Sequence, residues 1–350
     1  MRRTVVVTGA GLVSAVGDSP ADLHRALAEG RRATAIDRFD AAHYFGARNA
    51  RPLDRIAQLA AAAAGLALAD AGWTDQQRAA TPIGLVLGTV FSSVRTICAF
   101  DRRALEAGAQ FVSPLDFANT VLNAPAGQAA IWHRLRGPNV TVSTGAASGL
   151  QAIACASDLI ASGAADAALA GGADERSPEA LAALRRAGLM RDDDEIGEAA
   201  AFVLLEAGTT ASARGAQVRA EIRGLASGRA GDGGGDPAPD LIAALVRGAM
   251  ADAGVGVDAI DAVSAAGGSG RTEDCEARAL SLALCGRQRA LPMLTVSAAV
   301  GETLGAYTTF RAAGRWEPTV VGRAATPGAS EGGRWDHIAS VDIEERRHPL

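Results

Sequence analysis

Residues 139–150 read Asn-Val-Thr-Val-Ser-Thr-Gly-Ala-Ala-Ser-Gly-Leu, and this stretch decides the fold. A run of β-branched residues leads into a turn of small residues, and an apolar segment of helical length follows. A strand, a sharp turn and a helix in this order form an elbow. The helix dipole and the first backbone N–H groups of the helix can stabilise an anion there, and several enzyme folds hold a nucleophile at its apex. Ala146 stands at the apex here, and its methyl group offers neither a thiol nor a hydroxyl.

On both sides of the elbow, short apolar segments alternate with segments of helical length. Strands are predicted at residues 4–8, 83–88, 140–143, 167–170, 200–206, 260–265 and 294–297. Helices are predicted at residues 53–71, 126–135, 148–162, 241–253, 273–284 and 303–313. Ser19-Pro20 and Ser177-Pro178 each have the form of a helix N-cap followed by proline at the first helical position. This alternation predicts an α/β protein with mostly parallel sheets that are covered on both faces.

One glycine-rich stretch interrupts the alternation. Residues 224–239, which include Gly-Asp-Gly-Gly-Gly-Asp at 231–236, have a composition typical of a loop. A second set of strands and helices follows it. We therefore expect an N-terminal half (residues 1–215) and a C-terminal half (residues 216–350) that pack as one compact unit.

The composition excludes several classes of function. Hydrophobic residues make up 48% of the 350, and 41 glycines suit buried strands with tight turns. The net charge of −5 gives no basic field for nucleic acid. All 34 basic residues are arginine, so no lysine can form a Schiff base. The longest apolar run, residues 59–69, is too short to cross a membrane, which takes about 20 residues.

Cofactor and metal motifs are also missing from the sequence. Gly9-Ala10-Gly11 could open a dinucleotide fingerprint, but Ser14 stands where its third glycine belongs. The four cysteines show no CxxC spacing, which argues against a metal site or a disulfide framework. We expect no cofactor and no metal. The N-terminus enters a strand directly, without a cleavable signal, so we expect a cytoplasmic protein with reduced thiols.

Several stretches together resemble the β-ketoacyl synthases, the condensing enzymes with a thiolase-like fold. They span residues 5–14, 117–128, 135–139, 160–166, 170–173 and 197–200. The resemblance extends from Val5 to about Ile343. It implies an α/β, thiolase-like, duplicated α-β-α-β-α layered fold.

The resemblance also implies where a catalytic member would carry its cysteine, two histidines and lysine. The cysteine position is Ala146. The first histidine position is Gly267, or Ala266 if the motif is matched one residue earlier. Ser297 stands at the lysine and Glu302 at the second histidine. Since the nucleophile and its acid–base partners are all replaced, we expect no condensing activity from this chain on its own. Glu302 could act as a relocated acid or base, form a hydrogen bond across the site or pair with an arginine.

This pattern of replacement resembles the chain-length factors, which are ketosynthase-like subunits of type II polyketide synthases. The Gly-Glu at residues 301–302 resembles members from highly reducing systems that make polyenes. Many chain-length factors carry glutamine where Ala146 stands, and alanine offers no amide. The resemblance implies a heterodimer with an active ketosynthase and contact with an acyl carrier protein. Arg48, Arg51 and Arg55 could receive that acidic carrier, or could simply form a solvated helix entrance.

The resemblance further places one segment at the dimer interface, where the family lines its acyl channel. Phe111, Pro114, Phe117 and Thr120 are the candidate channel residues. The alternative is that these side chains only fill the interface. Two other functions stay open. One is an acyltransferase or thioesterase that uses other residues of the condensing fold, and the other is a homodimeric acyl-binding scaffold.

Overall fold

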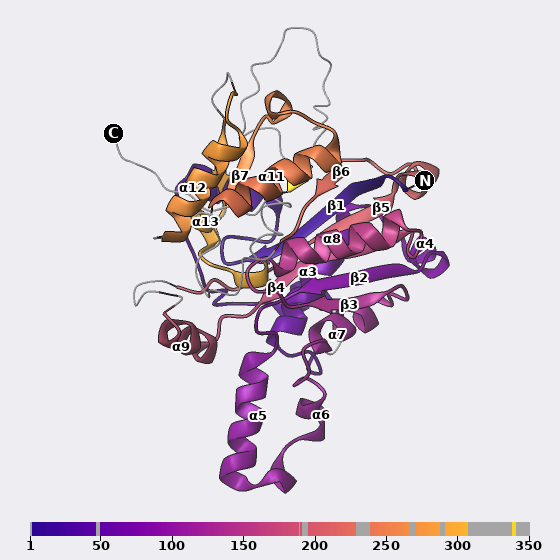
Figure 1. Cartoon of the computed structure of the whole chain (residues 1–350). Coiled ribbons are helices and arrows are strands. Elements are labelled where there is room, and N and C mark those ends of the chain that lie inside the picture. Colours follow the sequence, from indigo (N-terminus) through magenta and orange to yellow (C-terminus); the bar gives the residue numbers. More distant parts are fainter. Residues whose placement is uncertain are drawn as a thin grey trace.

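The central element of the structure is a seven-stranded sheet, with strand order β3-β2-β4-β5-β1-β6-β9 (Figure 1). The computed structural model describes residues 2–46, 50–188, 190, 195–228, 239–265, 271–287, 291–306 and 338–340. The strands of this sheet are β1 Val5–Ser14, β2 Ile83–Gly88, β3 Asn139–Val142, β4 Ala167–Asp174, β5 Ala199–Ala207, β6 Ala220–Leu225 and β9 Ile338–Ser340.

The sheet is mixed, which corrects the expectation of mostly parallel strands. β2 runs parallel to both β3 and β4, whereas β5 is antiparallel to its two neighbours, β4 and β1. β6 also pairs antiparallel with β1, so a strand of the expected C-terminal half extends the same sheet. Every residue of β1, β2, β4 and β5 is buried. A strand buried on both faces lacks polar alternation, so its sequence does not reveal the direction of its neighbours.

Helices cover both faces of the sheet. α3 (Arg55–Asp70) and α7 (Ala124–His133) pack on one face, where Leu85 and Leu87 of β2 point. α8 (Ser148–Ala161) packs on the other face, where Val86 points. Figure 1 shows α8 in front of the strands and α3 behind them. The two hydrophobic cores are thus separated by the sheet itself.

A smaller layer holds much of the C-terminal part. It contains a two-stranded parallel sheet of β7 (Val263–Ala265) and β8 (Met293–Thr295). α11 (Pro239–Ala253) and α12 (Arg271–Ala283) form a third hydrophobic cluster beside it. Apart from a helical arm, the remaining elements are α1 Pro20–Ala28, α2 Ala41–Phe45, α4 Asp75–Ala80, α9 Pro178–Arg186, α10 Gly208–Ala213, η2 Val257–Ala259, α13 Ser297–Val300 and η3 Leu304–Ala306.

The local signals in the sequence place most of these elements correctly. The side chains of Ser19 and Ser177 accept backbone N–H groups at the starts of α1 and α9, which confirms both predicted caps. β1 is a ten-residue strand, longer than the predicted 4–8. The helix predicted at 303–313 is wrong at its start, where a short 3₁₀ turn occupies 304–306, and its remainder lies outside the described residues. The loop predicted at 224–239 is wrong at its two ends, because 224–225 belong to β6 and Pro239 begins α11, and residues 229–238 lie outside the described residues.

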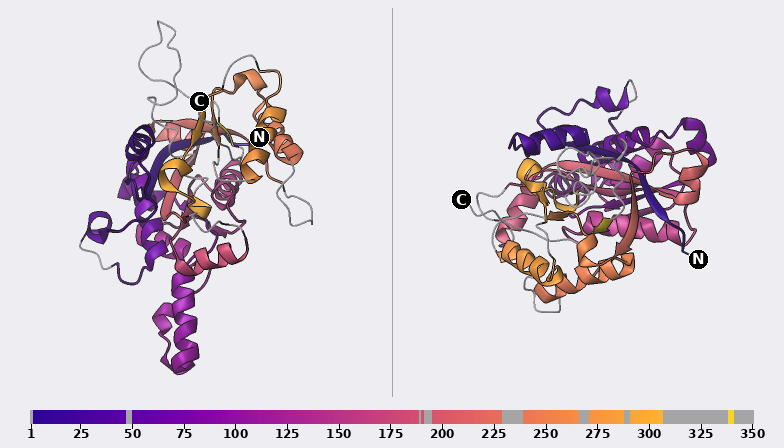
Figure 2. Two further views of the ribbon diagram at one scale, coloured as in Figure 1. Left: turned by 90° about the vertical axis from the view of Figure 1, so that its left-hand side faces the viewer. Right: turned by 90° about the horizontal axis from the view of Figure 1, so that it is seen from above.

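A helical arm extends away from the body of the molecule. It consists of α5 (Val94–Ala107), η1 (Ala109–Phe111) and α6 (Pro114–Phe117), and two views show it projecting well beyond the sheet (Figures 1 and 2). α5, all of whose residues are described, buries none of them. The large apolar side chains exposed on the arm are Leu105, Phe111, Leu115 and Phe117. An apolar surface of this kind is typical of a protein–protein contact. Across the described residues, no helix is both long enough and apolar enough to cross a membrane.

Candidate functional site

The elbow predicted from the sequence is present between β3 and α8. Gly145 adopts a positive φ of 77°, and the backbone N–H of Ser148 donates to its carbonyl over 3.0 Å. The Ser148 hydroxyl accepts the N–H of Thr144 over 2.9 Å and lies 2.5 Å from the Gly145 oxygen. It also lies 3.2 Å from the carbonyl oxygen of Thr89, just past the end of β2. These bonds fix the turn from inside the first helical turn.

Gly88 lets the first turn of α8 approach the end of β2. A Cβ built on Gly88 would lie 2.3 Å from the backbone carbon and oxygen of Ser148. Any larger residue at this position would therefore push the elbow away from the sheet. A glycine is required here to hold the turn in place.

Ala146 lies at the apex of the elbow and is exposed in the isolated chain. The N-cap residue of α8 is Ala147, whose side chain forms no cap hydrogen bond. The positive end of a 14-residue helix therefore lies beside a methyl group. The elbow keeps the electrostatic setting of a nucleophile, while Ala146 has no atom that could form an acyl enzyme.

The sequence analysis missed Asp174, a buried carboxylate at the end of β4 that ties the elbow region together. Asp174 is 1% exposed. Its carboxylate accepts the Thr89 hydroxyl over 2.8 Å and the N–H groups of Val90 and Phe91 over 3.0–3.2 Å. It also accepts the N–H of Gly305 over 2.7 Å. Burial raises the pKa of Asp174 to about 6, against the lowering effect of these hydrogen bonds. The sequence does contain a signal for this residue, because an acid follows directly after the apolar run Ala-Gly-Gly-Ala at residues 170–173.

Glu302 lies on the loop that Asp174 holds. Its carboxylate accepts the N–H of Leu304 over 2.7 Å, and its backbone oxygen accepts the N–H of Gly197 over 2.6 Å. The carboxylate therefore caps its own loop. Ser297, at the predicted lysine position, is the first residue of α13 and is half-buried. Gly267 and Ala266 lie outside the described residues.

The elbow and the Glu302 loop are joined by hydrogen bonds through Asp174. Ser148 contacts Thr89, Thr89 donates to Asp174, and Asp174 accepts from Gly305, three residues after Glu302. A Cβ on Gly305 would lie 2.8 Å from an Asp174 oxygen and 2.9 Å from the Thr89 Cα, so this loop also needs a glycine. The structure thus links two of the segments that the sequence analysis placed at one site.

The candidate channel residues lie apart from this cluster, on or next to the arm. Phe111, Pro114 and Phe117 are all exposed, with Phe111 at 57% and Phe117 at 60% exposure. The Phe117 ring packs against that of Phe100, with 5.9 Å between centroids. The hydroxyl of half-buried Thr120 donates to the Phe117 carbonyl over 2.8 Å. In the isolated chain the two Phe side chains face solvent, and a partner would be needed to make them line a channel.

The three arginines suggested to bind a carrier protein differ in how accessible they are. Arg55 forms a bidentate ion pair with buried Glu198, with its Nε 2.8 Å from Oε1, and donates to the Ile36 carbonyl. It is therefore held inside the protein and is a poor candidate for docking. Arg51 is exposed, and Arg48 lies outside the described residues. Among the described residues, no group of three or more His, Cys, Asp or Glu side chains is placed to hold a metal ion.

Glu175, next to Asp174, gives the stability of the fold a pH dependence. Burial raises its pKa from 4.5 to about 7, and the charges of Asp54 and Glu198 act in the same direction. The folded state therefore binds this proton more tightly than the unfolded chain. The resulting stabilisation is complete below about pH 4.5 and is lost as the pH rises through 7.

We expect Glu175→Gln to be more stable than the parent at pH 8, by on the order of 2–3 kcal/mol, because it removes a buried charge. The amide can still accept the Arg95 N–H, which donates to Glu175 over 3.1 Å. At pH 4.5 this advantage should vanish. Urea unfolding at both pH values measures the difference, with Glu179→Gln, a more exposed position on α9, as the control. An equal gain at both pH values would contradict this assignment.

Comparison with known proteins identifies the family. Residues 34–212 match the family described as "Beta-ketoacyl synthase, N-terminal domain", and residues 219–314 match "Beta-ketoacyl synthase, C-terminal domain". The chain is 32% identical to 3-oxoacyl-[acyl-carrier-protein] synthase 2 of Vibrio cholerae, over 87% of this chain and 83% of that protein. This chain therefore belongs to the β-ketoacyl synthase family.

Solved structures agree with this assignment. A β-ketoacyl synthase from Burkholderia phymatum superposes with a TM-score of 0.80 and 28% identity, covering 89% of this chain and 85% of that one. The ishigamide ketosynthase/chain length factor superposes with a TM-score of 0.76 and 26% identity over the same shares. The expected α/β thiolase-like fold is confirmed, with a mixed sheet between flanking helices.

Proposed function

We propose that this chain is a non-catalytic, chain-length-factor-like subunit of a β-ketoacyl synthase complex. In this proposal it pairs with an active ketosynthase and bounds the growing acyl chain, which an acyl carrier protein delivers, in type II polyketide or polyene elongation. The observation that carries the proposal is the elbow, whose strand, turn and helix are intact while Ala146 at its apex has no nucleophilic atom. Gly267, Ser297 and Glu302 at the other catalytic positions support it.

Two exposed features support a partner of the same fold. The arm presents Phe111, Leu115 and Phe117 to solvent. β3, which leads into the elbow, pairs with β2 on one side and forms the end of the sheet among the described strands. An apolar arm and an open strand edge on the same chain favour a large interface. Among similar solved structures, one is described as a ketosynthase/chain length factor. We also propose that the chain divides into an N-terminal and a C-terminal half after residue 215, and that the protein is cytoplasmic.

Co-expression with an intact ketosynthase from the same genome tests the pairing. We expect a 1:1 heterodimer by native mass spectrometry, since an obligate interface of this kind buries roughly 2,000 Å² or more. The chain alone should aggregate or form weak homodimers. A soluble monomer that does not bind the ketosynthase would refute the proposal. A stable homodimer that ignores it would favour an acyl-binding scaffold instead.

Within the heterodimer, Phe111→Ala and Phe117→Ala should lengthen the products. Each substitution opens space for further chain atoms, and each buried CH₂ contributes about 0.8 kcal/mol. Replacing Thr120 by a bulkier residue should shorten them. Leu105→Ala, at an 87% exposed position on the same arm, is the matched control. Mass spectrometry of the products decides: an unchanged distribution in both Phe variants, with the heterodimer intact, means that these residues only fill the interface.

A further inference from the structure

A groove at the far end of β3 from the elbow carries a second set of functional side chains. It has a volume of about 470 Å³ and lies between the ends of α7 and α4, with α2 beside it. Arg136 precedes β3 and lines the groove, whereas the elbow follows the other end of the strand. The groove is therefore separate from the ketosynthase-like site, and its ligand chemistry does not depend on the proposed function.

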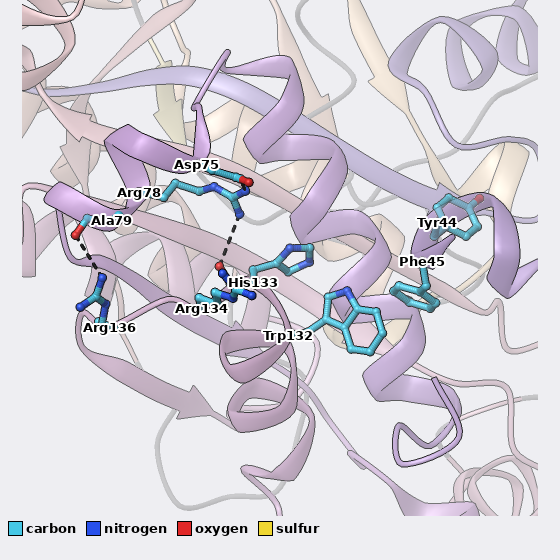
Figure 3. A pocket seen from close by; sticks show the side chains of 9 residues that line it. All are labelled: Tyr44, Phe45, Asp75, Arg78, Ala79, Trp132, His133, Arg134 and Arg136. Carbon is cyan, nitrogen blue, oxygen red and sulfur yellow. Dashed lines mark hydrogen bonds and ion pairs between the residues drawn. The ribbon is translucent and has the colours of Figure 1, made fainter. Parts of the chain in front are cut away.

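The groove has a cationic end and an aromatic end (Figure 3). Arg78, Arg134 and Arg136 line the cationic end, and Asp75 is the one carboxylate among the described lining residues. Tyr44 and Trp132 lie toward the other end, and the Trp132 ring packs edge-on against Phe45 with 4.8 Å between centroids.

Two of the three guanidinium groups are held in place by the protein. Arg78 pairs with Asp75 and donates to the His133 carbonyl over 3.4 Å, yet its buried Nε has no partner among the described residues. Arg136 donates to the Ala79 carbonyl over 3.0 Å. Fixed guanidinium groups are suited to bind the oxygens of an anion, because little entropy is lost when it arrives.

Arg134 is the most informative residue of the groove. It is the C-cap of α7 and adopts a left-handed conformation, with φ 57° and ψ 37°, where glycine or asparagine is usual. Its guanidinium is exposed and makes no hydrogen bond or ion pair within the described part of the chain. A strained backbone at an exposed residue suggests that the side chain has a use outside the fold.

We propose that this groove binds a small organic anion that joins a phosphate group to a planar ring, the chemistry shared by nucleotides and aryl phosphates. The phosphate lies among Arg78, Arg134 and Arg136, and the ring packs on Trp132. Arginine matches phosphate oxygens with paired N–H groups, and an indole face stacks on planar rings. The volume accommodates a ligand of this size.

Calorimetric titration of the full chain, purified together with its partner if it aggregates alone, tests the proposal with four probes: adenosine monophosphate, phenyl phosphate, inorganic phosphate and adenosine. We expect at least one of the first two to bind about tenfold more tightly than either of the last two, because only they engage both ends. Tighter binding of adenosine monophosphate than of phenyl phosphate would identify a nucleotide as the preferred ligand class. The reverse order would identify an aryl phosphate. If neither exceeds inorganic phosphate, the proposal is wrong.

Arg134→Gly separates binding from folding. Glycine relieves the left-handed backbone, so the thermal midpoint should stay equal or rise, while affinity for the preferred probe falls about tenfold or more. Arg2→Ala removes the same charge at an exposed site paired with Asp158 and should leave the affinity unchanged. Equal affinity in Arg134→Gly and the parent, or an equal loss in Arg2→Ala, would overturn the assignment.

Discussion

A cysteine introduced by Ala146→Cys is expected to leave this chain without measurable condensing activity, both alone and within the proposed heterodimer. The elbow would present the new thiol at the start of α8, where the helix dipole lowers a thiol pKa and favours the reactive thiolate. Condensation also needs groups that polarise the thioester and assist decarboxylation. Gly267, at the position proposed for the first histidine, cannot donate a proton, and Glu302, at the position proposed for the second, accepts the N–H of Leu304. Each missing acid–base partner costs about 10²–10⁴-fold in rate.

The measurement has two parts, so that a misfolded variant is recognised. Alkylation with iodoacetamide should modify the introduced thiol faster than that of Cys285, an exposed native cysteine far from the elbow in sequence. Acyl transfer and condensation are then followed with acyl and malonyl carrier proteins by mass spectrometry. Turnover by this variant alone would show that the remaining groups suffice for catalysis, and a covalent acyl adduct on the unmodified chain would contradict the proposed non-catalytic role.

Arg214→Ala is expected to destabilise the fold by about 3–5 kcal/mol, because it leaves a buried charge without its partner. Glu206 in β5 is fully buried, and Arg214 contacts it through Nε at 2.8 Å and a terminal nitrogen at 2.5 Å. The same carboxylate accepts the Thr8 hydroxyl and the indole N–H of Trp73. The guanidinium also packs over the Trp73 ring, 4.7 Å from its centroid. One arginine thus completes a network between β5, β1 and the end of α3.

Urea unfolding of the purified protein measures this loss. Arg2→Ala is the control, because Arg2 and its partner Asp158 are 63% and 67% exposed and such pairs contribute about 0–1 kcal/mol. Glu206→Gln should be milder than Arg214→Ala, since an amide keeps an acceptor for Thr8 and Trp73. Similar losses in Arg214→Ala and Arg2→Ala would show that the buried network adds nothing to stability.

The parts of the fold that depend on local signals were predictable from the sequence. The elbow at residues 139–150, the caps at Ser19 and Ser177, and β2 at 83–88 were placed correctly because each is specified by a few neighbouring residues. The direction of β5 was not, because both of its faces are buried and no periodicity distinguishes antiparallel from parallel pairing.

The candidate site was predictable only in part, for the same reason. The position of Ala146 follows from the local strand, turn and helix. The role of Asp174 depends on Thr89 and Gly305, which are 85 and 131 residues away, so no sequence window contains the contact. The arm was missed as an element although the sequence of α5 is amphipathic, and the structure shows that none of its residues is buried within the chain.

The exposed arm affects how quickly proteases degrade the protein in a cell. Since α5 buries none of its residues, it can unwind without disturbing either core of the large sheet. A protease would therefore cut an unpaired chain more readily within α5 than within either core, at a cost far below that of global unfolding. A bound partner would shield the same segment. Copies of this chain without a partner would then be degraded, so the amount of this chain would depend on the amount of its partner. The expression of the two genes would not need to be matched.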